Sequence, residues 1–229
     1  MSLKKLIALW LLAIFVFTGS LFASSWQFDR HETRKSFSES VSEIFALAPT
    51  SITGNFQDVQ QWRKIELQGK FVDDVLLIRN RPLNGRNGFW VVSNFENTTG
   101  SKIPVLIGWI SAQSSASSIV EPPSLPTEII ELEGIARDFE TRQTASDLPA
   151  GQYLTFDKDL LENSQNFFFQ SLKFNHDQLA QFQQVPIPNT TQGPHLFYAL
   201  QWLVFAAISI IGAAWFSYQE RLNVKPKRS

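Results

Sequence analysis

Three residues at the start of the C-terminal apolar stretch are of types that can carry chemistry together: His195, Tyr198 and Trp202. On a helix of 3.6 residues per turn they fall on nearly one face. A neutral imidazole there can donate a lone pair to a haem iron, while flat aromatic rings pack against the porphyrin edge. The alternative is that His195 is an interfacial polar residue and that both aromatics belong to a membrane belt, which is the commoner arrangement.

Other catalytic and metal-binding motifs are missing from the sequence. The chain has no cysteine, which excludes disulfides, thiolate metal sites, iron–sulfur clusters and cysteine nucleophiles. The spacing of His31, His176 and His195 is not that of a zinc site. No serine lies in a G-x-S-x-G motif. A net charge of −1 argues against nucleic acid as a partner. Zinc chemistry and serine-hydrolase chemistry therefore have no support in the sequence.

The first apolar stretch, residues 6–28, contains no charged side chain and is long enough to cross a bilayer. Because Lys4 and Lys5 precede it, a cleaved signal peptide is the alternative. Leu21-Phe22-Ala23 places a large residue where cleavage prefers a small one. We therefore expect the stretch to be retained as a transmembrane helix.

The second apolar stretch, residues 196–219, suits a tilted spanning helix. Basic residues lie on the terminal side of both stretches, which predicts that both termini are cytoplasmic. These residues are Lys4, Lys5, Arg221, Lys225, Lys227 and Arg228. The expected location is the inner membrane of a bacterium, with the main domain in the periplasm.

The pattern predicts five consecutive segments. They are a cytoplasmic N-terminus (1–5), a transmembrane helix (6–25), a periplasmic β-rich domain with an N-terminal helix (26–194), a second transmembrane helix (195–218) and a basic cytoplasmic tail (219–229). Small residues at four-residue spacing in the second span predict close packing of the two helices. These are Ser209, Ala213 and Ser217, expected to face Gly19 and Ala23.

Between the spans, the sequence predicts a helix over 29–47, ending before Pro49, and then short strands. The strands are expected near 63–71, 75–80, 89–95, 103–110, 129–136, 152–156 and 167–174. Asp73-Asp74 and Asn97-Thr98-Thr99-Gly100 are typical of hairpin turns, which favours antiparallel pairing. The predicted fold class is two terminal transmembrane helices that flank an antiparallel β-rich extracytoplasmic domain, either a barrel or a sandwich.

Several motifs follow one another along the chain. They are Trp26-Gln27-Phe28-Asp29-Arg30 with Lys35, Gly69-Lys70-Phe71, Arg79-Asn80-Arg81-Pro82-Leu83 with Gly88-Phe89, Gly108-Trp109, Glu133-Gly134, and the segment from His195 to Trp202. In this order, within a two-span chain, the set resembles the Surfeit locus one family of cytochrome oxidase assembly proteins. The resemblance covers nearly the whole chain.

The resemblance implies a factor that is not an enzyme and that helps build haem–copper cytochrome c oxidase. Such a factor would bind haem a and assist its insertion into the large oxidase subunit. Its partners would be that subunit, the haem a synthesis machinery and the lipid bilayer. His195 would correspond to the family's proposed haem ligand. Arg30, with Arg34 and Lys35, can pair with the haem propionates; the alternative is a solvated helix start.

Three positions depart from the family pattern: Ile107 stands where the family usually has Arg, Pro194 where it has Asn, and Asn94 where it has Pro. The missing Arg means either that the propionates are met elsewhere or that haem is not bound. Two other functions therefore remain open. One is a membrane-tethered periplasmic binding, sensory or scaffold protein without haem, and the other is an enzyme whose site the sequence does not reveal.

Overall fold

We describe a computed structural model of the 229-residue chain. The described residues are 2–51, 59–112, 122–145, 148–162, 165–187, 191 and 193–223, so most of the predicted basic tail lies outside them. The chain divides into two compact units. We call them the helix-pair unit, residues 1–41 and 189–229, and the barrel unit, residues 42–188.

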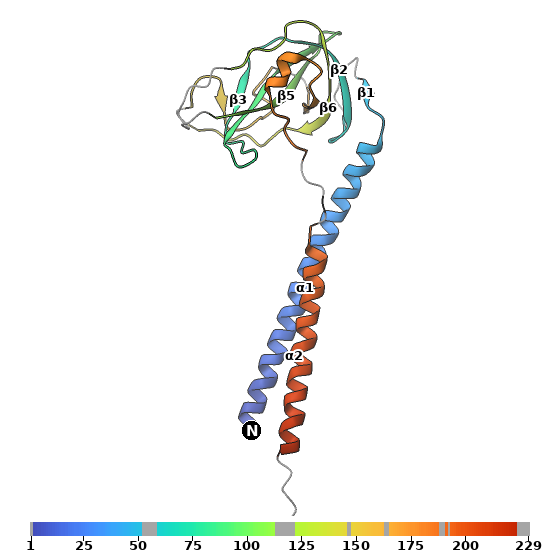
Figure 1. Ribbon diagram of the computed structural model, residues 1–229, viewed down its shortest axis with the longest axis vertical. Coiled ribbons are helices and arrows are strands. Elements are labelled where there is room, and N and C mark those ends of the chain that lie inside the picture. Colours follow the sequence, from blue (N-terminus) through green and yellow to red (C-terminus); the bar gives the residue numbers. More distant parts are fainter. Residues whose placement is uncertain are drawn as a thin grey trace, which may run out of the picture. The chain divides into compact units, whose positions relative to one another are not determined.

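The helix-pair unit contains α2 (His195–Asn223) and all but the last five residues of α1 (Leu3–Ala46), and the two helices run side by side in opposite directions (Figure 1). At 1.5 Å per residue, α1 is about 66 Å long, roughly twice the thickness of a hydrocarbon core. No Gly or Pro occurs between residues 20 and 46, so the helix predicted over 29–47 continues the apolar stretch without a break. It ends before Pro49, which disfavours helical geometry at the residue in front of it.

Among the described residues, α1 and α2 are both long and apolar enough to cross a membrane. The spans predicted at 6–25 and 195–218 lie within these helices and remain predictions.

Small residues line the contact between α1 and α2. The buried ones are Ala13, Ser20 and Ser24 on α1, and Ala199, Ala206 and Ala213 on α2. The alanines recur every seven residues, which keeps one face of α2 toward its partner, and small side chains let the backbones approach closely. The expected packing is thus found at Ala213 and at Ser217, which accepts a hydrogen bond from Trp10 of α1. It is wrong for Gly19, where an added Cβ would meet nothing within 4 Å. The reason is helical geometry, because consecutive residues point 100° apart and Ser20 takes the inward position.

Five strands of the barrel unit close into a ring. They are β2 (Lys64–Phe71), β4 (Gly88–Asn97), β5 (Lys102–Ser111), β6 (Ile130–Asp138) and β8 (Phe167–Lys173). Their order around the ring is β2-β6-β8-β5-β4 and back to β2. Only β5 and β8 pair in parallel; the other neighbours are antiparallel. This connectivity is that of a five-stranded Greek-key barrel of the OB type, so the β-rich domain is a barrel rather than a sandwich.

Shorter elements extend the sheet and follow it. They are β1 (Thr50–Ser51), β3 (Leu76–Ile78), β7 (Gln152–Tyr153) and the 3₁₀ helix η1 (Asp177–Gln181). The sequence did not predict β1, and the strand expected over 152–156 is reduced to β7. The other predicted strands are found with their ends shifted by a few residues.

The turn predicted at Asp73-Asp74 is not a hairpin. Strands β2 and β3 do not pair with each other but lie one after the other along β4, with Phe71 opposite Phe95 and Leu76 opposite Val92. Asp73 instead accepts hydrogen bonds from Lys102 Nζ at 3.1 Å and from Asn94 Nδ2 at 2.7 Å. The hydrogen bond to Asp73 raises the pKa of Lys102.

The predicted turn at residues 97–100 is found between β4 and β5. The Asn97 side-chain oxygen accepts hydrogen bonds from the backbone N–H groups of Thr99 and Ser101. Gly100 has a φ of +82°, which a side chain would strain.

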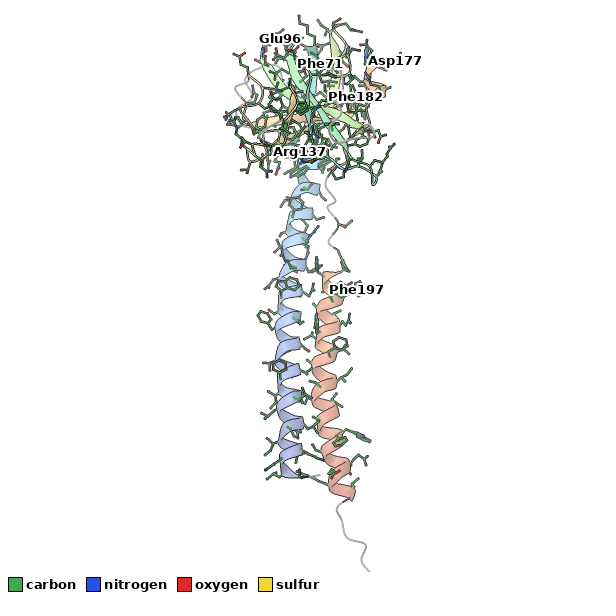
Figure 2. All side chains as sticks on the ribbon, turned by 90° about the vertical axis from the view of Figure 1, so that its left-hand side faces the viewer. Phe71, Glu96, Arg137, Asp177, Phe182 and Phe197 are labelled. Atoms are coloured by element: carbon green, nitrogen blue, oxygen red, sulfur yellow. The ribbon has the colours of Figure 1, made fainter. Side chains whose placement is uncertain are left out.

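The barrel unit buries apolar side chains on both faces of β4 and β5. Phe71, Val105 and Phe182 belong to the cluster that includes the barrel interior, and Figure 2 labels Phe71 and Phe182 among the barrel side chains. Trp109 and Phe168 belong to a second cluster, packed on the other face of these strands. Burial on both faces explains why β4 and β5 are nearly continuous apolar runs rather than alternating patterns.

Candidate functional site at the mouth of the helix pair

Helix α2 begins at His195, directly after two residues that shape the chain for it. Gly193 has a φ of +70°, and the carbonyl of Pro194 accepts the first helical hydrogen bond, from Tyr198 N at 3.2 Å. Pro194 therefore starts the helix without the side-chain cap that Asn would supply. The His195 ring is partly buried, and its Nδ1 lies 2.9 Å from Oε1 of Gln27 on α1.

Two further polar contacts join the same helices. Near the N-terminus of α1, the Trp10 indole N–H donates to Ser217 Oγ at 3.1 Å. Further along, Ser24 Oγ donates to the carbonyl of Ala199 at 2.9 Å, and this bond is buried. Small residues let the two helices pack closely, and hydrogen bonds between them add to this packing. The Gln27–His195 contact lies at one end of this helix–helix interface.

The second ring nitrogen of His195, Nε2, has no hydrogen-bond partner within the described ranges. An added Cβ at Gly193 would lie 3.5 Å from it, so glycine keeps the ring edge clear at that point. When Nδ1 donates its hydrogen to this acceptor oxygen, a neutral ring keeps a lone pair on Nε2. The site can thus offer one imidazole nitrogen to a metal.

Of the other predicted site residues, Tyr198 and Trp202 follow His195 on α2 and Arg30 lies on α1, and no described contact joins any of them to the His195 ring. Tyr198 is 47% exposed and Trp202 is 36% exposed, with its ring edge-on to Phe205 at 5.6 Å. Arg30 lies over the Trp26 ring, at 5.8 Å from its centroid. A cation–π contact of this kind leaves the guanidinium N–H groups free to bind an anion.

The remaining histidines differ in their suitability as ligands. His176, in the barrel unit, uses both ring nitrogens: Nε2 contacts Glu128 Oε1 at 2.7 Å, and Nδ1 accepts from Gln178 N at 3.2 Å. Hydrogen bonds to its own backbone and then to His176 lower the pKa of Glu128. His31 lies on α1, one turn beyond Gln27, and its buried Nδ1 has no hydrogen-bond partner among the described residues.

Comparison of the sequence with known proteins identifies the family of the chain. A sequence model of the SURF1 family matches residues 13–207, a range that contains both Gln27 and His195. The chain belongs to the SURF1 family. It is 27% identical over 174 residues to uncharacterized SURF1-like proteins of Mycobacterium bovis and of two strains of Mycobacterium tuberculosis. The match covers 70% of this chain but 61% of each relative, so the chain spans about three fifths of their length.

Arg81, from the motif at residues 79–83 on which the resemblance rested, makes its contacts inside the barrel unit. Its guanidinium lies 4.0 Å from the centroid of the Trp90 ring and pairs with Glu140 at 2.5 Å. The same group donates to the carbonyl of Leu154 at 3.2 Å. These contacts fasten the segment before and after β7 to the barrel.

Gly108-Trp109, another pair on which the resemblance rested, holds the segment that follows η1 against β5. The backbone of Trp109 exchanges two hydrogen bonds with Gln183, at 2.8 and 2.9 Å, and its indole N–H donates to the carbonyl of Arg81. A Cβ at Gly108 would come within 2.7 Å of Phe182 Cβ, so only glycine allows this approach. These barrel motifs are therefore explained by packing.

Two departures from the family pattern also lie in the barrel unit. Ile107 is 1% exposed and packs in the same cluster as Val105, so this position presents no charge to any ligand. Asn94 is fully buried and donates to Asp73 and to the carbonyl of Glu162. Both residues serve the barrel in this chain.

Arg137 is a charged residue that sequence analysis did not single out. Its Nη1 donates to Gln170 Oε1 at 2.6 Å, and its guanidinium lies 4.8 Å from the centroid of the Trp62 ring. Burial lowers the pKa of Arg137. Trp62 has a φ of +72°, an uncommon geometry for a bulky residue. No sequence pattern marks this cluster, because its members come from separate strands and loops.

Proposed function

We propose that this SURF1-family chain is an assembly factor for haem–copper cytochrome c oxidase, which binds haem a through His195 and assists its transfer to the large oxidase subunit. Family membership supports the oxidase as the target. The observation that carries haem binding is the His195 ring, held through Nδ1 by Gln27 with Nε2 left unbonded in the described part of the chain.

The residues of the site fit a haem. A haem supplies an iron that accepts one imidazole nitrogen, and a neutral His195 has that nitrogen available. The partly exposed rings of Tyr198 and Trp202 offer apolar surface to a porphyrin, and Arg30 offers positive charge to its propionates. Since Ile107 is buried in the barrel, we assign the propionates to Arg30 and its neighbours on α1.

In the proposed topology, α1 and α2 cross the bacterial inner membrane, both termini are cytoplasmic and the barrel unit is periplasmic. The basic residues outside both apolar stretches support it. A reporter fused at Ser115 should be active only when exported, and one fused at Ser229 only in the cytoplasm. A cytoplasmic reporter at Ser115 would overturn the topology. Intact mass should show that the N-terminal segment is retained.

The haem assignment is tested by the visible spectrum of the full chain, purified in detergent from cells that make haem a. We expect His195→Ala to abolish the Soret band while the protein's level in the membrane stays unchanged, because a helix this apolar inserts without the imidazole. His176→Ala is the matched control and should keep the band, since both nitrogens of that ring are already engaged. His31→Ala tests the second axial position. Equal haem in His195→Ala and wild type would show the ligand assignment to be wrong.

A scaffold function without haem is the second candidate, and the buried Ile107 is the observation that favours it. The two candidates differ in what accompanies the purified chain. A haem-binding factor brings haem a along with oxidase subunits or the haem a synthesis machinery. A scaffold brings the oxidase subunits with no Soret band.

A further inference from the structure

We propose that Gln27 is a positioning residue, which fixes the tautomer of His195 and thereby makes Nε2 the nitrogen that binds iron. The inference rests on the proposed function for its biological meaning. The contact itself belongs to the chain and can be measured without haem.

The chemistry follows from the atom that faces the ring. A side-chain amide oxygen only accepts hydrogen bonds, so Oε1 at 2.9 Å requires the ring hydrogen on Nδ1. The neutral ring then has its lone pair on Nε2. An amide turned the other way would donate to Nδ1 and place the hydrogen on Nε2, which could then bind no metal. Hydrogen bonds from such supporting groups set both the tautomer and the orientation of metal-binding histidines.

The helix pair explains how Gln27 reaches the ring. Gln27 follows Ser20 and Ser24 by seven and three residues, so it lies on the face of α1 that packs against α2. The buried bond from Ser24 to Ala199, one turn away, shows that this face of α1 contacts α2. On the far side of the imidazole, Gly193 lacks the Cβ that would otherwise lie 3.5 Å from Nε2. One ring nitrogen is thus held by α1 while the other stays clear.

The first test reads the tautomer directly. The full chain is labelled with ¹⁵N-histidine and studied in detergent micelles without haem, and His195→Ala identifies the His195 signals among the three histidines. We expect the wild type to show a protonated Nδ1 and an unprotonated Nε2. Gln27→Leu should lose this preference and show mainly Nε2–H. Gln27→Met, which keeps the length of the side chain, should behave like Gln27→Leu.

Ser24→Ala is the matched control, because it removes a hydrogen bond between the same helices without touching the ring. Its His195 signals should match those of the wild type. The same tautomer in wild type and Gln27→Leu, or Nε2–H in the wild type, would overturn the role of Gln27.

The second test uses haem affinity and reduction potential. We expect Gln27→Leu to weaken haem binding by about 10- to 100-fold, the usual effect of removing a supporting hydrogen bond from a metal ligand. Gln27→Glu should restore binding and lower the midpoint potential, because a carboxylate acceptor makes the imidazole a stronger donor to ferric iron. Ser24→Ala should change neither quantity.

The two proposals fail in different ways. A wild-type protein that binds no haem refutes the proposed function, and the tautomer measurement still decides the role of Gln27. A wild type that binds haem through His195, with equal affinity and potential in Gln27→Leu, refutes the role of Gln27 and leaves the proposed function standing.

Discussion

Arg81 provides the sharpest test of the conclusion that barrel motifs shared with the SURF1 family act through packing. Arg81→Met removes the guanidinium and keeps most of the length of the side chain. The substitution deletes the ion pair with Glu140, the bond to the Leu154 carbonyl and the stacking on Trp90. The backbone carbonyl of Arg81, which accepts from the Trp109 indole, stays in place.

The size of the effect follows from the burial of the pair. The side chains of Arg81 and Glu140 are 18% and 27% exposed. Breaking a fully buried pair costs about 3–5 kcal/mol, and a hydrogen bond to a charged group contributes about 1.5–3 kcal/mol. Partial exposure places the expected loss at about 3 kcal/mol of unfolding free energy. For a unit of this size, that loss lowers the melting temperature by about 6–12 °C.

Denaturant unfolding of the full chain in detergent, followed by tryptophan fluorescence, measures the change. The double variant Arg81→Met with Glu140→Gln should lose less stability than the two single variants together, because neither partner is then left charged and alone. Folded Arg81→Met protein should carry as much haem as the wild type. A stability change below about 0.5 kcal/mol, the range of ordinary surface substitutions, would refute the packing explanation. So would loss of haem at unchanged stability.

Further predictions concern the barrel core, a carboxylate and the helix contact. Ile107→Arg should destabilise the barrel by more than about 4 kcal/mol, seen as loss of the folded protein, because the charge has no partner in the core. The pKa of Glu128 is lowered in the fold, so its carboxylate stabilises the barrel above the ordinary Glu pKa, and this contribution is lost as the pH falls through the folded pKa. Glu128→Gln should therefore lower the denaturation midpoint at neutral pH and converge with the wild type in acid. Cysteines at Ser24 and Ala199 should form a disulfide in this otherwise cysteine-free chain, and cysteines at Gly19 and Ala199 should not.

Local sequence patterns predicted most strands because β-prone runs are bounded by turn residues. They did not predict the closure of the barrel, which depends on the parallel pairing of β5 with β8 across some sixty residues of chain. Asp73 shows how a local signal misleads. Two aspartates are typical of a turn, but the chain continues along β4 and Asp73 binds Lys102 and Asn94 instead.

For the candidate site too, local sequence predicted one part, and the other part depends on contacts between distant residues. His195 could be nominated from its type and its place before an apolar stretch. The contact with Gln27 could not, because the two residues are 168 positions apart in sequence and meet only through the register of the two helices. One signal was available: Ala199, Ala206 and Ala213 recur every seven residues and mark the face of α2 that packs on α1.

The structure thus separates two kinds of residue within the SURF1 pattern. Arg81, Gly108 and Trp109 make contacts inside the barrel unit that explain why these residue types stand there. His195 differs, because one of its ring nitrogens contacts Gln27 and the other has no hydrogen-bond partner within the described part of the chain. Substitutions in the first group should therefore act through the amount of folded protein. Substitutions at Gln27 and His195 should act on a ligand while the fold remains intact.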